Sequence, residues 1–393
     1  MTRMHRTVWL LAVCQALLMT GNTLMITTSA LVGQSLAPRP GLATLPLALQ
    51  FFATMLTTLP ASWSMKRAGR QAGFMVGAVF GIAGALAAAH AVQAGAFAWF
   101  CAGSALIGMA NGFGVFYRFA AIDVATADYR SRAVSYVLAG GIVAAFAGPN
   151  LANWTRDIVA AEPFYASYTG LALVHALAIG VLLFVKVPRP SAAVVHQSGR
   201  PLMQIMRQPV FIVALLGAML GYGIMSLVMT ATPLAMQRHA HAFSDAAFVI
   251  EWHVLGMFAP SFVTGHLIRR FGVLRIMMWG ALCMVGCVGA NLSGTSVSHF
   301  WLALVLLGVG WNFLFVGGTT LLAEAYAPAE EAKVQAINDF IVFGTVTGAS
   351  LSSGALLQLL GWQAVNVGVT PLIAVILAAV LWLRWLRARG VPA

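Results

Sequence analysis

Charged side chains are scarce in this sequence. Lysine, arginine, aspartate and glutamate together make up 8% of the 393 residues, whereas hydrophobic residues make up 60%. Soluble domains carry about 25% charged residues, and no water-soluble fold can bury so large an apolar share. We therefore exclude a soluble globular protein and expect a chain whose solvent is the lipid bilayer.

Cysteine is also rare. Cys14, Cys101, Cys283 and Cys287 all fall inside apolar stretches, and no C-x-x-C spacing occurs. This pattern excludes a disulfide framework and offers neither a zinc site nor a redox pair. A P-loop is absent too, so ATP-driven pumping has no support. We expect no cofactor and no metal, because the lone His239-Ala240-His241 motif is weak evidence for a metal site.

Apolar stretches, in contrast, fill the chain. A helix needs about 20 apolar residues to cross a bilayer, and about twelve such stretches can be placed here. A polar segment rich in proline and glycine, residues 186–208, separates two groups of six. The predicted fold is an all-α integral membrane protein with about twelve transmembrane helices in two pseudo-symmetric bundles. The expected domains are residues 1–185, the cytoplasmic linker 186–208, and residues 209–393.

The basic residues are distributed unevenly. A formal net charge of +12 would suit a nucleic-acid-binding protein, but these charges lie between the apolar stretches. If the N-terminus is cytoplasmic, 19 of the 22 Lys and Arg residues lie on the cytoplasmic side, and only Arg39, Arg156 and Arg238 lie outside. The positive-inside rule therefore predicts cytoplasmic termini in a plasma (inner) membrane, and we expect no nucleic-acid partner.

An internal repeat relates the two groups of helices. Similar features recur about 200 residues apart, in matching loops. They are Lys66-Arg67-Ala68-Gly69 and Arg269-Arg270-Phe271-Gly272, then Asp123 and Glu324, then Arg132 and Lys333. Three such coincidences at nearly one offset indicate duplicated halves, a common design among secondary transporters.

Twelve spans in two halves, with a basic loop after the second and eighth helices, resemble the major facilitator superfamily along the whole chain. The family's loop signature, G-x-x-x-D-[RK]-x-G-[RK]-[RK], is similar to segment 62–71. Arg67, Gly69 and Arg70 match it, whereas Lys66 and, in the second copy, Arg269 stand where the family has an acid. The charge at this position is therefore inverted in both halves.

Antiporter motifs of the same family are similar to parts of the fourth and fifth helices. Segment 108–114 resembles R-x-x-Q-G-x-G with Gly108 in place of the arginine. Gly148-Pro149 matches the G-P of the second motif, with Ala144 in place of the preceding glycine. These resemblances suggest proton-coupled efflux.

The resemblance also implies where substrate binds, because the first, fourth, seventh and tenth helices of the family line a central cavity. The polar and aromatic residues midway along these helices are Gln15, Asn22, Asn111, Tyr222, Trp311 and Asn312. Amides in membrane helices also join neighbouring helices, with about 0.6 to 2 kcal/mol each, so both roles stay open. Amides and aromatic rings with few charges favour a neutral or aromatic amphipathic solute.

Two acids fall inside predicted spans. An ionised group near the bilayer centre costs at least about 2.5 kcal/mol, so Glu251 and Asp339 are candidates for ion coupling. Glu251 could instead sit in a wet vestibule near the membrane surface. Asp339 could simply complement the dipole of its helix, since it lies in the first turns.

Charged loop residues are candidates for gating. In the family, the loop acid docks against the cytoplasmic end of the eleventh helix, so we expect the inverted Lys66 to bridge to Asp339. Within each half, we expect Arg67 or Arg70 to pair with Asp123, and Arg270 to pair with Glu324. The predicted gating residues are Lys66, Arg67, Arg70, Asp123, Arg269, Arg270 and Glu324.

Small residues recur at every fourth position in several spans. They are Gly140, Ala144 and Gly148, and the pairs Gly108 and Gly112, Gly217 and Gly221, and Gly344 and Gly348. Such faces let helices approach closely. We favour ordinary packing over a sliding role in transport.

The predicted function is secondary active transport of a small solute by alternating access, without enzymatic activity. A membrane-embedded enzyme or a lipid scramblase or flippase is the alternative. An enzyme would bring clustered intramembrane acids or histidines, whereas the acids here are scattered. The expected partners are a small-molecule substrate, the lipid bilayer and a coupling proton, and we expect a monomer.

Overall fold

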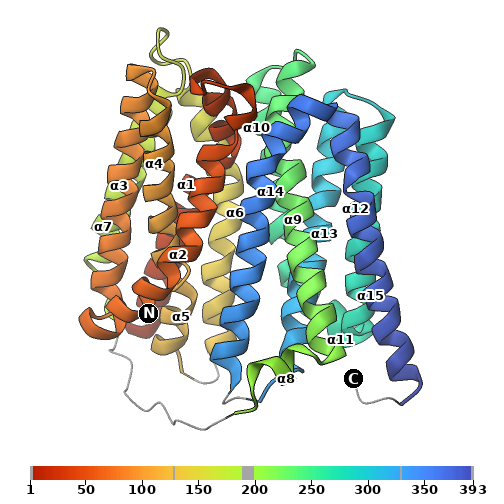
Figure 1. Cartoon of the computed structure of the whole chain (residues 1–393). Coiled ribbons are helices and arrows are strands. Elements are labelled where there is room, and N and C mark those ends of the chain that lie inside the picture. Colours follow the sequence, from red (N-terminus) through yellow and green to blue (C-terminus); the bar gives the residue numbers. More distant parts are fainter. Residues whose placement is uncertain (1–2, 127–128, 188–198, 328–329, 391–393) are drawn as a thin grey trace. The chain divides into compact units, whose positions relative to one another are not determined.

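The computed structural model describes residues 3–126, 129–187, 199–327 and 330–390, and these residues form helices and turns without a strand (Figure 1). Ten segments are long and apolar enough to cross a membrane, and α10 (Phe243–Phe258) with α11 (Ser261–Phe271) forms an eleventh, bent by 43°. One of the ten is 56 residues long, about 84 Å of helix against a hydrocarbon core of about 30 Å. Gly361, with φ 81° and ψ 173°, interrupts it, so it suffices for two crossings. The prediction of an all-α membrane protein with about twelve spans is confirmed.

The helices pack as two compact units. The first runs from the N-terminus through α7 and includes residues 233–255, and the second includes residues 199–232 and 256–390 of the described chain. By contacts alone, therefore, the end of α9 and most of α10 group with the N-terminal helices. The division of the chain at 186–208 stays a prediction.

The first unit contains eight complete helical elements. They are α1 (Arg3–Leu36), the short 3-10 helix η1 (Pro40–Leu42), α2 (Leu45–Ala68), α3 (Arg70–Ala94), α4 (Phe97–Gly114), α5 (Tyr117–Val124), α6 (Arg130–Thr155) and α7 (Tyr165–Leu182). Helix α1 packs on α6 and α7, α3 packs on α4 and α7, and α2 packs on α4.

Small residues account for the close approach of α1 and α6. A Cβ atom added at Gly140 would lie 2.8 Å from the backbone N of Ala16, and one added at Gly148 would lie 2.7 Å from the carbonyl O of Thr20. The Thr23 hydroxyl donates a hydrogen bond of 2.8 Å to the carbonyl O of Ala144 across the same contact. This face is therefore closely packed, as the spacing of its small residues predicts.

The second unit contains the remaining helices. They are α8 (Leu202–Met206), most of α9 (Pro209–Arg238), α11, α12 (Val273–Ser293), α13 (Val297–Leu322), α14 (Glu331–Gly368) and α15 (Thr370–Ala388). Helix α12 packs on α13, α14 and α15, and α11 packs on α12 and α13.

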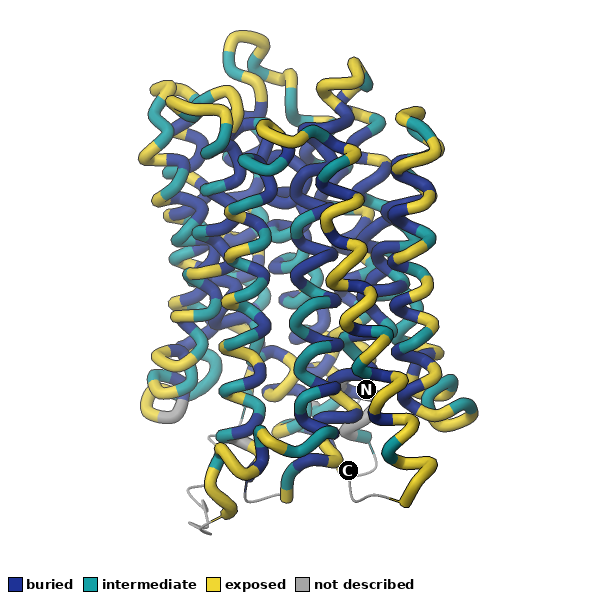
Figure 2. The backbone as a smooth tube through the Cα atoms, turned by 45° about the vertical axis from the view of Figure 1, so that its right-hand side comes forward, coloured by how far each residue is buried: buried dark blue, intermediate teal, exposed yellow. Residues whose placement is uncertain are grey.

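Large apolar side chains are exposed along the helices. Leu59 and Trp154 are 73% exposed, and Leu359 is 79% exposed. Figure 2 shows exposed residues all along the helices and not only at their ends. In water such surfaces would aggregate, whereas in a bilayer they contact lipid chains.

One glycine joins each pair of helices at the two copies of the loop motif. Gly69 separates α2 from α3 with φ 92° and ψ 157°, and Gly272 separates α11 from α12 with φ 87° and ψ 147°. Only glycine adopts this region readily, because it has no Cβ. The two repeats therefore turn with nearly the same backbone conformation.

Candidate functional site

Three amide side chains meet inside the first unit. The Oδ1 of Asn22, on α1, accepts hydrogen bonds from the Nε2 of Gln50 on α2, at 2.7 Å, and from the Nδ2 of Asn111 on α4, at 3.3 Å. Gln50 is fully buried, and Asn111 is 8% exposed. We call Asn22, Gln50 and Asn111 the amide cluster.

The amide cluster retains unused acceptors. The Oε1 of Gln50 and the Oδ1 of Asn111 are buried and have no hydrogen-bond partner among the described residues. A buried polar atom left unpaired costs about 1–3 kcal/mol, so such atoms commonly bind water or a ligand. Gln15 lies two turns from Asn22 on α1, half-buried, and does not join the cluster.

Aromatic rings gather in the second unit. Tyr222, on α9, lies 5.2 Å from Trp311 on α13, ring centroid to centroid, and 5.7 Å from Phe315. The Trp311 and Phe315 rings are stacked at 5.0 Å with an interplanar angle of 10°. Phe343 lies 6.1 Å from Tyr222, and Phe258 lies 6.3 Å from Trp311. These five residues form the aromatic cluster.

The aromatic cluster holds one unused donor. The indole Nε1 of Trp311 is buried and has no hydrogen-bond partner among the described residues. A buried indole N–H usually finds a partner. The cluster therefore combines stacked aromatic faces with a donor that a carbonyl group of a ligand could satisfy.

Asn312, the neighbour of Trp311, has a different environment. Its Oδ1 accepts a hydrogen bond of 2.7 Å from the Thr264 hydroxyl. Its Nδ2 donates to the carbonyl O of Met257 at 2.7 Å and to the hydroxyl of Ser261 at 2.6 Å. These bonds tie α13 to the bend between α10 and α11. They favour the helix-joining role of Asn312, one of the two roles that the sequence left open.

The two intramembrane acids also differ. Glu251 is half-buried on α10, and its Oε2 accepts a hydrogen bond of 2.7 Å from the Nδ2 of Asn150, on α6. Asp339 is exposed on α14, and its Oδ1 accepts a bond of 3.1 Å from the Nδ2 of the adjacent Asn338. Glu251 is thus hydrogen bonded to a helix distant in sequence, and Asp339 is hydrogen bonded to its neighbour in the chain.

Ion pairs occur at both copies of the loop after the fourth helix of each half. Arg70 pairs with Asp123 at 2.6 Å, one of the two alternatives expected. Glu324 pairs with Arg387, on α15, at 2.6 Å, so the expected partner Arg270 is wrong. Arg270 instead lies 5.2 Å from the ring of Phe271, and its place beside Glu324 is taken by the last turn of α15.

The other predicted gating residues lie at or near the ends of α2 and α11. Arg67 lies over the Trp63 ring, 3.7 Å from its centroid, and Arg269 is exposed at the end of α11. The side chain of Lys66 lies outside the described residues. The expected bridge from Lys66 to Asp339 therefore stays a prediction.

A clamp that the sequence did not predict holds the start of α8. The Oε1 of Glu330 accepts bonds from the Nε of Arg200 at 2.9 Å and from its backbone N at 2.7 Å, and the Oε2 accepts from Nη2 at 2.8 Å. The backbone N of Ala327 adds a bond of 2.9 Å, and Lys333 donates to the carbonyl O of Arg200. This network, chiefly the bonds from Arg200, lowers the pKa of Glu330 from 4.5 to about 2.

Sequence reasoning missed several of these residues. Gln50 could have been found, because an amide inside an apolar stretch is a signal in itself. Phe315 could have been found too, since it lies one turn from Trp311. Asn150 is also an amide inside an apolar stretch, but its partner Glu251 lies 101 residues away. Phe343 carries no local signal, because Tyr222 lies more than 100 residues away.

The sequence matches proteins of known family along its whole length. The profile of the Major Facilitator Superfamily matches residues 11–290 and 214–393. The riboflavin transporter RfnT of Brucella anthropi is 41% identical over 382 residues, covering 97% of this chain and 96% of that protein. The uncharacterized MFS-type transporter YddS of Bacillus subtilis is 29% identical over 379 residues, covering 91% and 86%.

A solved structure has the same fold. The D-xylose–proton symporter superposes with a TM-score of 0.70 at 14% sequence identity, over 96% of each chain. The relatives are transporters, which removes the alternative of a membrane-embedded enzyme. The chain belongs to the Major Facilitator Superfamily and is a multi-pass membrane transporter.

Proposed function

We propose that this transporter carries a flat, neutral heteroaromatic solute of the riboflavin class by alternating access. The aromatic cluster supports the proposal most directly. Its rings offer faces on which a planar ring system can stack, at about 1–3 kcal/mol per stacked ring by analogy with nucleobases. The 41% identity to a riboflavin transporter over nearly the whole chain supports the same class of solute.

The polar atoms of both clusters suit this chemistry. Riboflavin carries ring carbonyls, a ring N–H and a chain of hydroxyls, and it has no net charge. The indole Nε1 of Trp311 can donate to a carbonyl, and the Oε1 of Gln50 and the Oδ1 of Asn111 can accept from N–H or O–H groups. None of these three atoms requires a charged ligand. Asn22 and Tyr222 complete the residues that we assign to substrate binding, whereas Gln15 and Asn312 have less support.

Counterflow in proteoliposomes tests the proposal. Purified protein in vesicles loaded with unlabelled riboflavin should accumulate external labelled riboflavin, and empty liposomes should not. Trp311→Phe keeps a ring but loses the N–H, and Trp311→Ala loses both. We expect KM to rise in that order, by roughly tenfold or more for Trp311→Ala. Trp382, exposed on α15, provides the control Trp382→Ala, which should leave KM unchanged.

Two results would reject this substrate class. One is the absence of riboflavin counterflow from vesicles that exchange a neutral solute without an aromatic ring, such as D-xylose. The other is riboflavin counterflow with the same KM in wild type and Trp311→Ala.

We further propose that Glu251 is the ion-coupling residue and that a proton is the coupling ion. Glu251 supports this role because it is half-buried, ionisable and hydrogen bonded to another helix. The antiporter-like motifs favour efflux, and a pH gradient of either sign across the vesicle membrane will establish the direction. The 19-to-3 distribution of basic residues supports cytoplasmic termini in an inner membrane. We retain a monomer as the working state.

A further inference from the structure

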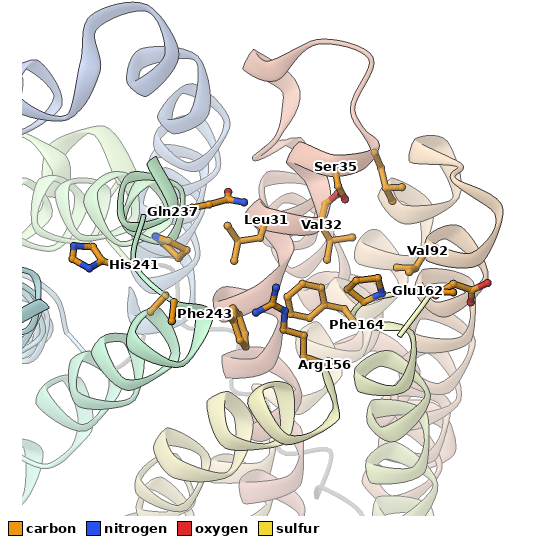
Figure 3. A pocket seen from close by; sticks show the side chains of 16 residues that line it. Leu31, Val32, Ser35, Val92, Arg156, Glu162, Phe164, Gln237, His241 and Phe243 are labelled. Carbon is orange, nitrogen blue, oxygen red and sulfur yellow. The ribbon is translucent and has the colours of Figure 1, made fainter. Parts of the chain in front are cut away.

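A cavity of about 320 Å³ lies at the end of the first unit that is farthest from the N-terminus. Its walls come from the end of α1, the loop between α6 and α7, and the segment that joins α9 to α10 (Figure 3). Leu31, Val32, Pro163 and Pro233 are among its apolar residues. Its polar residues are Ser35, Arg156, Glu162, Gln237 and His241. We call it the distal pocket, and none of the substrate or ion-coupling residues above lines it.

Arg156 is fixed at the wall of the distal pocket. Its guanidinium carbon lies 5.6 Å from the ring centroid of Phe164 and 5.2 Å from that of Phe243. Figure 3 shows the guanidinium between these two rings. Cation–π contacts of this kind hold a guanidinium by its faces and leave its N–H edges for hydrogen bonds.

The charge of Arg156 is only partly compensated. Its Nε lies 3.4 Å from the Oδ1 of Asp157, whose side chain is 69% exposed. The same Nε is buried and has no hydrogen-bond partner among the described residues. Glu162 is the acid in the lining, and its carboxylate points away from Arg156 in Figure 3. The Arg156 side chain is 37% exposed, so its guanidinium combines a partly compensated charge with access to the cavity, and an anion gains affinity at such a group.

The backbone around the distal pocket is strained. Phe164 (φ 72°) and Ala240 (φ 60°) are the two non-glycine residues with positive φ in the described part of the chain. Phe164 lines the pocket, and Ala240 precedes the lining residue His241. Such conformations cost about 1–3 kcal/mol each and cluster at functional sites. One strained residue therefore lines the cavity, and the other directly precedes a lining residue.

We propose that the distal pocket is a second ligand site, which binds a small aromatic carboxylate. Its carboxylate accepts hydrogen bonds from Arg156, and its ring packs against the apolar walls. Gln237 lines the same cavity and offers the ligand a further polar group. The volume suits a molecule of about the size of benzoate, at the lower end of the usual range of ligand pockets.

Binding to the purified protein in detergent tests this site without any transport measurement. Isothermal titration with benzoate is compared with benzamide, which has the same shape and no charge. We expect benzoate to bind the wild type at least about tenfold more tightly than benzamide, because the neutral amide forms no ion pair with Arg156 and offers one acceptor oxygen where the carboxylate offers two. We also expect Arg156→Gln to lose at least tenfold in benzoate affinity, and Arg156→Lys to lose part of it.

The matched control is Arg39→Gln, which removes an exposed arginine that does not line the cavity. It should bind benzoate like the wild type. If Arg156→Gln does not yield monodisperse protein, Arg156→Lys takes its place, since it keeps the charge but not the planar fork. Equal affinities for benzoate and benzamide, or an unchanged benzoate affinity in the Arg156 variant that folds, would overturn the proposal. A riboflavin counterflow experiment that fails leaves this test unaffected.

Discussion

The side-chain amide of Asn150, on α6, donates a hydrogen bond of 2.7 Å to the carboxylate of Glu251, on α10, 101 residues further along the chain. Protonation of Glu251 would remove its negative charge and weaken this bond, since bonds to an ionised acceptor are about twice as strong as neutral ones. The contact between α6 and α10 therefore depends on the charge of one carboxyl group.

Glu251→Gln should abolish transport driven by a pH gradient and retain solute exchange, because glutamine accepts the bond from Asn150 but cannot titrate. We expect gradient-driven accumulation to fall at least about tenfold and counterflow to stay within about twofold. Asp245→Asn, in the first turn of the same helix, is the control and should change neither. Gradient-driven accumulation that persists in Glu251→Gln would exclude Glu251 as the coupling residue.

Asn111→Ala and Asn312→Ala should have different effects, although both remove an asparagine from corresponding helices. Asn111→Ala should raise KM several-fold with little change in unfolding temperature. The side-chain oxygen of Asn111 accepts no hydrogen bond from the described residues, so its loss affects a bound solute more than the fold. Asn312→Ala should lower the unfolding temperature, because it removes the bonds of Asn312 to the Ser261 hydroxyl and the Met257 carbonyl, at about 1–3 kcal/mol per unpaired buried group, whereas Thr264 keeps its bond to the Pro260 carbonyl. Counterflow kinetics and thermal unfolding in detergent separate the two effects. Identical profiles for the two variants would contradict the assignment.

Glu330→Gln should destabilise the protein at neutral pH and less so in acid. The pKa of Glu330 is lowered to about 2 in the folded state, so its contribution is present above its ordinary value of 4.5 and is lost as the pH falls through 2. The difference in unfolding temperature between wild type and variant should therefore shrink between pH 4.5 and 2. Glu331→Gln, which changes the exposed neighbour, is the control and should show no such trend. A constant difference across this range would argue against the clamp.

Gly148→Ala and Gly348→Ala should differ, although the two glycines occupy matching positions in the repeat. A Cβ at Gly148 would meet the Thr23 hydroxyl and lie 2.7 Å from the Thr20 carbonyl O, whereas a Cβ at Gly348 meets no described atom within 4 Å. Overpacking costs about 1–3 kcal/mol, so Gly148→Ala should lower the yield and the unfolding temperature of monodisperse protein. Gly348→Ala should behave like the wild type. Equal losses of yield and unfolding temperature in both variants would show that close packing at the small-residue face of α6 does not cause the destabilisation.

Cysteine labelling should establish the orientation. Met203, on α8, is 59% exposed, and Ile158, in the loop after α6, is 66% exposed. In a background without the four native cysteines, Met203→Cys should react with an impermeant maleimide only from the cytoplasmic side, and Ile158→Cys only from outside. The reverse pattern would overturn the positive-inside assignment.

The fold could be predicted because it follows from the length and number of the apolar stretches, and each helix satisfies its own backbone in the membrane. The Arg70–Asp123 pair could also be anticipated, since Arg70 directly follows the repeated loop motif and Asp123 has a counterpart in Glu324. The partner of Glu324 could not, because Arg387 lies 63 residues further on, at the end of another helix. Charge alone does not distinguish it from Arg270.

The candidate sites could be predicted only in part, for a similar reason. Polar residues in apolar stretches are visible in the sequence, so Asn22, Asn111 and Trp311 could be chosen. Whether such a residue is satisfied depends on neighbours from other helices, as the three hydrogen bonds of Asn312 show. The distal pocket depends on the backbone of Phe164 and Ala240, and no spacing rule indicates a positive φ at either residue.

The single-glycine joints at Gly69 and Gly272 make these loops sensitive to length as well as to composition. A single residue separates α2 from α3, and a single residue separates α11 from α12. Neither joint has further loop residues that could change conformation to accommodate an insertion. Because successive residues of a helix are about 100° apart around its axis, one insertion would turn α3 by more than a quarter revolution. Gly77, Gly81 and Gly84 would then leave the grooves formed by Phe113, His175 and Ile107. The glycine joints therefore fix the rotational phase of two helices in each half, and a one-residue insertion there would be more disruptive than most substitutions.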